Sequence, residues 1–229
     1  MNSPRRRSSS TIRRRRISTR PDALLFDLDG TLLDSERLWE AAQQNVMAYF
    51  GEQWTAADQA HAIGGPIERV VGYIASRTGG DEGHVARILV SEIEHLVATE
   101  SAHWMPGARE LLAAARAEDV PTAIVSNSWR VLLDLLVRNM DVQPDVTVSS
   151  TEVMRPKPDP EPFLTACHLL NARPQATWVV EDSPTGAQAG LAAGCWVLGV
   201  GPAIDGLQDP RLLKVASLAS VTLASLALN

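Results

Sequence analysis

The chain has 229 residues, 45% of them hydrophobic, which fits one large domain or one domain with a small insertion. No run approaches the roughly 18 apolar residues that a membrane-spanning helix needs, so we expect no membrane partner. Eight of the 21 lysines and arginines lie in residues 1–20, which leaves 13 against 27 acidic side chains. The resulting net charge of −14 on the remainder argues against nucleic acid as its partner.

The N-terminal segment and the cysteines bear on where the protein works. Residues 1–20 are rich in arginine and serine, and two isoleucines are their only sizeable aliphatic residues after the first methionine. Such a segment cannot bury enough apolar surface to fold, so we predict a disordered tail, with DNA binding through its arginines as an open alternative. Cys167 and Cys195 form no C-x-x-C pair, which fits a reducing compartment. We therefore expect the protein in the cytoplasm.

Residues 23–28 predict a buried parallel strand that ends in acidic residues. The run 23–26 is apolar, and Leu28 lies between Asp27 and Asp29. Ligands of open α/β sheets bind beyond the carboxyl ends of the strands, so these two carboxylates mark a candidate site. The alternative is an ordinary strand followed by an Asp-Gly turn.

A helical block is predicted over residues 35–104. Apolar residues recur at helical spacing over 38–50, 67–74 and 85–96, and Ser35 is a suitable N-cap for the first helix. The sequences Gly64-Gly65-Pro66 and Gly79-Gly80 separate these helices.

Strands and helices alternate from residue 105 onward. Helices are predicted over 108–118, 130–138, 160–170 and 184–193, and strands over 122–125, 146–148, 177–180 and 196–200. This alternation predicts an α/β fold with a doubly wound, Rossmann-like parallel sheet. Its core would comprise residues 21–34 and 105–229, with the helical block inserted after the first strand. The last twenty residues predict a final strand or helix at the sheet edge, and the choice between them stays open.

Polar residues follow three more of the predicted strands. They are Ser126 and Asn127, Lys157, and the pair Glu181 and Asp182. Parallel strands share one carboxyl edge, so the acidic groups would crowd there, which like charges tolerate only when a proton or a cation joins them. Carboxylates suit Mg²⁺, and a lysine ammonium supplies a point charge for phosphate. This set predicts phosphoryl transfer.

The four motifs resemble those of the haloacid dehalogenase-like superfamily. DLDGT at 27–31 is similar to the first motif, Ser126-Asn127 to the second, Lys157-Pro158 to the third and Glu181-Asp182 to the fourth. The helical insert resembles the members with a small α-helical cap, a subgroup that contains β-phosphoglucomutase and sugar-phosphate phosphatases. One departure is Pro156, since relatives often have glycine before the lysine.

The resemblance implies roles for the two acids of the first motif. Asp27 would be the nucleophile that forms an aspartyl-phosphate, which splits one hard step into two. Asp29 would be the acid/base, which protonates the leaving alcohol and then activates water. The second acid favours phosphate chemistry over dehalogenation, because dehalogenases of this superfamily lack it.

The resemblance also implies ligands for the metal and for the phosphoryl group. Mg²⁺ would be held by oxygens of Asp27, the Asp29 backbone carbonyl and Asp182, with Glu181 in the inner or outer shell. The phosphoryl group would be bound by hydroxyl, amide and ammonium groups of Thr31, Ser126, Asn127 and Lys157.

The fate of the aspartyl-phosphate separates a phosphatase from a mutase. β-Phosphoglucomutases carry a histidine twelve positions after the nucleophile and a lysine in the cap. This chain has Trp39 at that position, and its two lysines, Lys157 and Lys214, lie outside the insert. We therefore predict hydrolysis of a small phosphate monoester, a sugar phosphate. A phosphosugar mutase is the alternative, and a catalytically silent binding protein of the same fold is a further one.

Substrate choice is expected to depend on residues of the helical block that face the core. The candidates are Glu36 for sugar hydroxyls, Trp39 for stacking and Arg69 for an anionic group. The alternative for each is ordinary surface or core packing, which is favoured for Trp39. Residues 34–39 also resemble bacterial 2-deoxyglucose-6-phosphate and hexitol phosphatases. We expect a monomer whose partner is a small phosphate ester.

Overall fold

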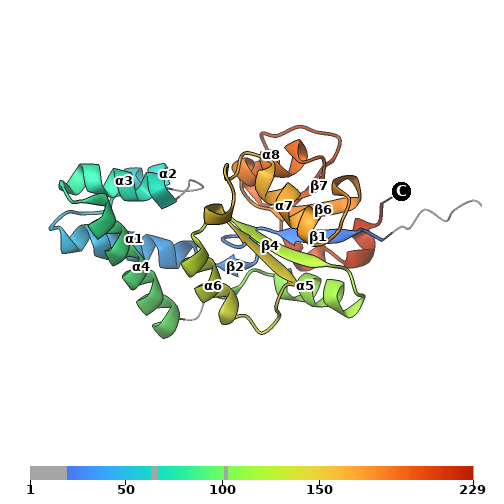
Figure 1. The fold of residues 1–229 in the computed structure, drawn as a ribbon, viewed down its shortest axis with the longest axis horizontal. Helices are drawn as coiled ribbons and strands as arrows, with labels where there is room; N and C mark the ends of the chain where they lie inside the picture. Colours follow the sequence, from blue (N-terminus) through green and yellow to red (C-terminus); the bar gives the residue numbers. More distant parts are fainter. Residues whose placement is uncertain (1–19, 63–66, 101–102, 229) are drawn as a thin grey trace, which may run out of the picture.

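The larger sheet has six parallel strands and is shown in Figure 1, a computed structural model that describes residues 20–62, 67–100 and 103–228. The strand order is β5-β4-β1-β6-β7-β8. The strands are β1 (Ala23–Phe26), β4 (Thr122–Ser126), β5 (Val146–Ser149), β6 (Thr177–Glu181), β7 (Trp196–Val200) and β8 (Leu212–Val215). The predicted doubly wound parallel sheet is confirmed, and the open choice at the C-terminal end is resolved as an edge strand followed by short 3₁₀ turns.

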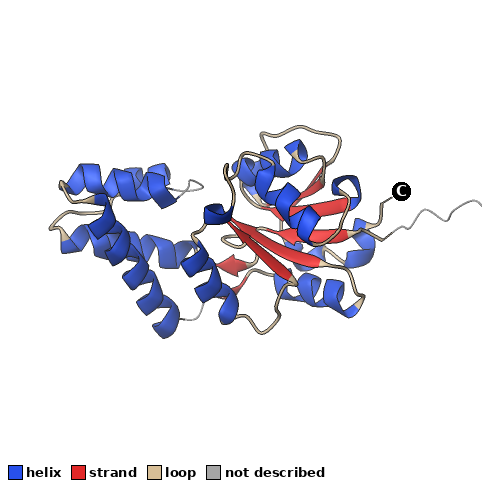
Figure 2. Ribbon diagram, in the orientation of Figure 1, coloured by secondary structure: helices blue, strands red, loops and turns tan. Residues whose placement is uncertain are grey.

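Helices cover both faces of this sheet, as Figure 2 shows. They are α5 (Ala108–Ala117), α6 (Arg130–Arg138), α7 (Glu161–Leu169) and α8 (Pro184–Ala192). Alternate residues of β1 point to opposite faces. Leu24 and Phe26 belong to the apolar cluster that includes α5 and α6, whereas Ala23 and Leu25 belong to the cluster that includes α7 and α8. A strand that is apolar on both faces is therefore buried throughout, as predicted.

The described residues between a pair of short strands form four helices at one end of the core. They are α1 (Glu36–Tyr49), α2 (Ala56–Ala62), α3 (Ile67–Thr78) and α4 (Glu82–Thr99), between β2 (Leu33–Asp34) and β3 (His103–Trp104). The two strands pair in antiparallel register. The predicted break at 64–66 lies outside the described residues. The boundary between core and cap at 34 and 105 stays a prediction.

The helical block packs directly against the core. Residues of both parts belong to one apolar cluster, which joins α1, α3 and α4 to α5 and α6. Trp129, which precedes α6, also donates a hydrogen bond to Glu68 of α3 at 2.6 Å. These contacts position the block over the carboxyl ends of β1 and β4.

The predicted tail lies outside the described residues except for Arg20, which donates to the Asp119 carbonyl at 2.6 Å. Within the described ranges, no helix has both the length and the apolar character needed to cross a bilayer.

Candidate active site

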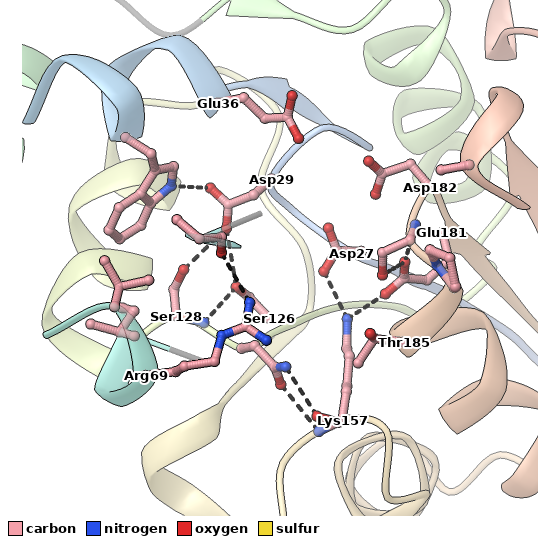
Figure 3. Close-up of a pocket in the computed structure, with 18 of the residues that line it drawn as sticks. Asp27, Asp29, Glu36, Arg69, Ser126, Ser128, Lys157, Glu181, Asp182 and Thr185 are labelled. Carbon is pink, nitrogen blue, oxygen red and sulfur yellow. Dashed lines mark hydrogen bonds and ion pairs between the residues drawn. The ribbon is translucent and has the colours of Figure 1, made fainter. Parts of the chain in front are cut away.

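Three carboxylates meet where β1 and β6 end. Asp27 follows β1, whereas Glu181 ends β6 and Asp182 follows it, and the two strands are neighbours in the sheet. One oxygen from each carboxylate lies within 4.8 Å of the others. Figure 3 shows all three side chains at one end of the cavity. Residues more than 150 positions apart thus form one acidic cluster.

Lys157 lies among these carboxylates. Its side chain is 3% exposed, and its Nζ atom is 2.7 Å from Asp27 Oδ1 and 2.7 Å from Glu181 Oε1. The same ammonium lies 4.9 Å above the centre of the Phe163 ring. Burial alone would lower the pKa of Lys157, but Asp27 and Glu181 more than offset this and raise the pKa above its usual value. The lysine is therefore a permanent positive charge in the site.

The loop that carries Lys157 is held by Asn127. The Asn127 side-chain amide donates to the Lys157 carbonyl at 3.2 Å and accepts from the Lys157 backbone N–H at 3.1 Å. The proline at 156 does not keep the ammonium away from the carboxylates. The side chain of Asn127 thus anchors the lysine loop, and the residue also lines the cavity, where its backbone N–H is predicted to bind phosphate.

The first motif also orients Asp182. The backbone at Gly30 has φ = +83°, and a Cβ there would lie 2.4 Å from Asp182 Oδ2, so only glycine permits this approach. The Thr31 hydroxyl, predicted to bind the phosphoryl group, donates to Asp182 Oδ1 at 2.9 Å and is fully buried. Burial, followed by the charge of Glu181, raises the pKa of Asp182 to about 7.

The crowded carboxylates fit a divalent cation. Burial raises the pKa of Asp27 well above its usual value, and the nearby carboxylates raise it further, whereas Lys157 opposes the shift. The three clustered side chains offer only carboxylate oxygens, which are the ligands that hard cations prefer. A second positive charge would stabilise the ionised forms that Lys157 alone does not balance. The cluster is thus compatible with a divalent metal ion.

Four donors surround the carboxylate of Asp29. Its Oδ1 accepts from the Ser35 hydroxyl at 2.5 Å and from the Trp39 indole N–H at 2.8 Å. Its Oδ2 accepts from the hydroxyls of Ser126 at 3.3 Å and Ser128 at 3.0 Å. Ser35 precedes α1 as predicted, but its hydroxyl makes no capping bond to that helix. These donors come from two parts of the chain and fix the direction of the Asp29 side chain.

A cavity of about 440 Å³ lies between the sheet edge and the helical block. The three predicted specificity residues, Glu36, Trp39 and Arg69, all line it. The Arg69 guanidinium donates to the His61 carbonyl at 2.8 Å. Burial raises the pKa of Glu36, and the charges of Asp29 and Asp34 raise it further. The cavity therefore has the acidic cluster at one end and cap residues at the other.

Several contributors to the site were not predicted in these roles from the sequence, and four of them are polar residues that had not been proposed for the site. They are Ser35 and Ser128 as partners of Asp29, and Gln43 and Thr185 in the cavity wall. Of these four residues, Ser128 could have been proposed from the sequence, because it lies two residues after Ser126 and follows the end of the same predicted strand.

Comparison with known proteins assigns the family. The sequence model of the family described as haloacid dehalogenase-like hydrolase matches residues 24–200, which is more than half of the chain. The chain belongs to the haloacid dehalogenase-like hydrolases. The resemblance of its four motifs to this superfamily is thereby confirmed.

Several proteins with known names are similar to the chain. It is 32% identical to Hexitol phosphatase A of Escherichia coli (strain K12), over 83% of this chain and 87% of that protein. It is 30% identical to the Validoxylamine A 7'-phosphate phosphatase of Streptomyces hygroscopicus subsp. limoneus, over 77% and 84%. Both relatives are phosphatases, so the predicted enzyme class, a phosphoric monoester hydrolase, is confirmed.

Two solved structures share the fold of the chain. CbbY from Rhodobacter sphaeroides in complex with phosphate superposes with a TM-score of 0.77 at 22% identity, over 87% of this chain and 96% of that chain. A HAD family hydrolase from Deinococcus radiodurans R1 with bound phosphate and sodium has a TM-score of 0.61 at 32% identity, over 80% and 81%. At 22% identity, the similarity to CbbY shows a shared fold only.

Proposed function

We propose that this chain is a Mg²⁺-dependent phosphatase that hydrolyses a sugar phosphate through an aspartyl-phosphate on Asp27. The observation that carries the proposal is the position of Asp27 at the end of the cavity, 2.7 Å from the Lys157 ammonium and beside two further carboxylates. A nucleophile paired with a fixed positive charge suits attack on an anionic phosphoryl group.

The reaction would proceed in two steps. In the first, a carboxylate oxygen of Asp27 bonds to phosphorus while the ester P–O bond breaks, and Asp29 gives its proton to the leaving alkoxide. In the second, Asp29 takes a proton from a water that attacks the aspartyl-phosphate. The bond between the Asp27 oxygen and phosphorus breaks, which releases phosphate, regenerates the Asp27 carboxylate and leaves Asp29 protonated for the next cycle. Lys157 and the hydroxyl of Ser126 would bind the phosphoryl oxygens.

The metal would be held by Asp27, the backbone carbonyl of Asp29 and Asp182. When bound, Mg²⁺ supplies positive charge that offsets the charge of the phosphoryl oxygens. Glu181 accepts from Lys157 at 2.7 Å and from the Ser183 N–H and hydroxyl at 3.0 and 2.9 Å. Both oxygens of Glu181 already accept hydrogen bonds, which supports a position for Glu181 in the outer coordination shell of the metal rather than in the inner one.

The names of the relatives and the cap support a sugar phosphate as substrate and hydrolysis as the outcome. Hexitol phosphatase A is 32% identical to this chain. The position where β-phosphoglucomutases carry a titratable histidine holds Trp39, whose N–H donates to Asp29. An indole cannot exchange a proton with a second sugar phosphate at neutral pH. This difference favours release of phosphate over its return to a sugar.

The proposal is tested by phosphate release from a panel of sugar and polyol monophosphates with Mg²⁺. We expect turnover that EDTA abolishes and that Asp27→Asn reduces by at least about 10⁴-fold, since the nucleophile is lost. Equal residual rates in the wild type and in Asp27→Asn would indicate a contaminant and support a catalytically silent protein. Conversion of β-glucose 1-phosphate to glucose 6-phosphate would indicate a mutase instead.

The division into a core, residues 21–34 and 105–229, and a cap, residues 35–104, is part of the same proposal. The monomeric state and the cytoplasmic location remain predictions from the sequence.

A further inference from the structure

One face of α1 contributes three residues to the cavity wall. Glu36, Trp39 and Gln43 follow one another at intervals of three and four positions, which places them on the same side of a helix. Two of these residues interact with Asp29. Burial and the charge of Asp29 raise the pKa of Glu36, and the indole N–H of Trp39 donates a hydrogen bond to Asp29. Gln43 has no such relation to the catalytic groups.

Gln43 is buried and its amide oxygen lacks a partner. The residue is 5% exposed, and its Oε1 atom accepts no hydrogen bond from any residue that the structure describes. Among the described residues, the only other buried side-chain nitrogen or oxygen without a hydrogen-bond partner is Nε of Arg130, and Arg130 does not line the cavity. Folded proteins satisfy nearly all buried polar groups, so an exception in a cavity wall calls for a partner that arrives from outside.

The surroundings of Gln43 select the kind of partner. Besides Gln43, the helical block contributes five apolar residues and three polar or charged ones to the cavity wall: Trp39, Ala62, Ile67, Val70 and Leu89, and Glu36, Gln59 and Arg69. A neutral amide accepts through its oxygen and donates through its nitrogen, and a hydroxyl has the same two capacities. A ligand with a hydroxyl at this position therefore binds more tightly than one with a methylene, because the methylene leaves the buried amide without a hydrogen-bond partner.

We propose that Gln43 binds a substrate hydroxyl remote from the phosphate and thereby selects phosphate esters of polyhydroxylated carbon chains. This inference rests on the proposed phosphatase function and adds the residue that recognises the substrate. The phosphoryl group binds at the Asp27 end of the cavity. The hydroxylated chain extends toward α1, where Gln43 meets it. A cavity of about 440 Å³ is within the size range of small-molecule sites.

The test compares two substrates of matched length in three proteins. The substrates are the best polyol or sugar phosphate of the panel, with sorbitol 6-phosphate as the first choice, and n-hexyl phosphate, which has the same chain length without hydroxyls. The proteins are the wild type, Gln43→Met and Gln44→Met. Gln44 is the matched control, because it is the next residue of α1, is exposed, and donates to Glu40 at 3.1 Å.

We expect Gln43→Met to lower kcat/KM for the polyol phosphate by roughly 10-fold or more, mainly through KM, because a substrate hydroxyl is buried without a partner. The rate on hexyl phosphate stays the same or rises, and Gln44→Met changes neither. Equal effects on both substrates, or none on either, would overturn the assignment of Gln43 while the phosphatase function stands. Failure of the wild type on both substrates and on p-nitrophenyl phosphate would instead refute the function itself.

Thermal unfolding without substrate separates recognition from a structural role. Replacing an unpaired buried amide with an apolar side chain of similar shape does not destabilise a protein. We therefore expect Gln43→Met to melt at or above the wild-type temperature, and Gln43→Leu to behave alike. A clear fall in the melting temperature of both variants would show that Gln43 has a partner within the folded protein and would contradict the proposal.

Discussion

Trp39 interacts with Asp29 and with the apolar core at the same time. Its indole N–H donates to Asp29 Oδ1 at 2.8 Å, while its ring packs against the apolar cluster shared by core and cap. A ring held by packing fixes the direction of its N–H, and the N–H in turn fixes the carboxylate. We therefore interpret Trp39 as a positioning residue for Asp29, the proposed acid/base, in addition to the packing that its helical spacing suggests.

Replacement of Trp39 by phenylalanine tests this interpretation. A hydrogen bond to a charged group is worth about 1.5–3 kcal/mol, so we expect kcat to fall by at least about tenfold with little change in KM. Steady-state rates with p-nitrophenyl phosphate measure both constants. Trp104→Phe is the matched control, because the Trp104 indole donates to a carboxylate, Asp141, at 3.1 Å away from the active site. A higher KM at unchanged kcat would instead indicate direct stacking of Trp39 on the substrate.

The junction between β6 and α8 is the element that holds the acidic cluster together. Ser183 caps α8, with its hydroxyl accepting from the Gly186 N–H at 3.0 Å. The same residue donates twice to Glu181. Gly186 lies so close that a Cβ there would be 1.6 Å from Glu181 Oε1. The first turn of the helix thus sets the position of a carboxylate that in turn holds Lys157.

Gly186→Ala is expected to disturb this junction. The added methyl group must displace Glu181, which is fully buried and bonded on both oxygens, and such overpacking costs about 1–3 kcal/mol. For a chain of this length that corresponds to a melting temperature lower by roughly 2–12 °C, and we expect kcat to fall as well. Gly206→Ala is the control, since nothing lies within 4 Å of its added Cβ. Equal melting temperatures for the two variants would show that the junction tolerates a shifted Glu181.

At the scale of the whole molecule, the cluster combines segments that are distant in the chain. Asp27 and Asp182 come together because β1 and β6 are neighbours in the sheet. Like charges at this spacing oppose folding unless a cation joins them, and Lys157 supplies only one positive charge. A divalent ion that binds the native cluster alone would therefore stabilise the fold.

Addition of Mg²⁺ is expected to raise the melting temperature. At a concentration 100 times Kd the stabilisation is about 2.7 kcal/mol, which corresponds to a shift of roughly 5–11 °C. Differential scanning fluorimetry with MgCl₂ and with EDTA measures it. Asp182→Asn removes most of the shift, whereas the same change at the exposed Asp205 keeps it. Equal shifts in the two variants would mean that the ion binds elsewhere.

The fold class and the motif positions could be read from the sequence, because both depend on local patterns. Alternating strands and helices follow from hydrophobic period and from turn residues within short windows. The acidic residues at the ends of 23–26 and 177–180 could be assigned to one edge, since parallel strands with helical connections share that edge. The strands β2 and β3 escaped prediction because two residues are too few to show a period.

The hydrogen bonds that complete the site required the tertiary structure. Asp29 takes its donors from the start of α1 and from the segment after β4, and which side chains reach it depends on how these elements pack. Asn127 bonds to the Lys157 backbone across 30 positions, and Gln43 faces a cavity enclosed by several helices. No local pattern records such partners, because a side chain's direction relative to a distant element follows from packing, whereas its residue type follows from the sequence.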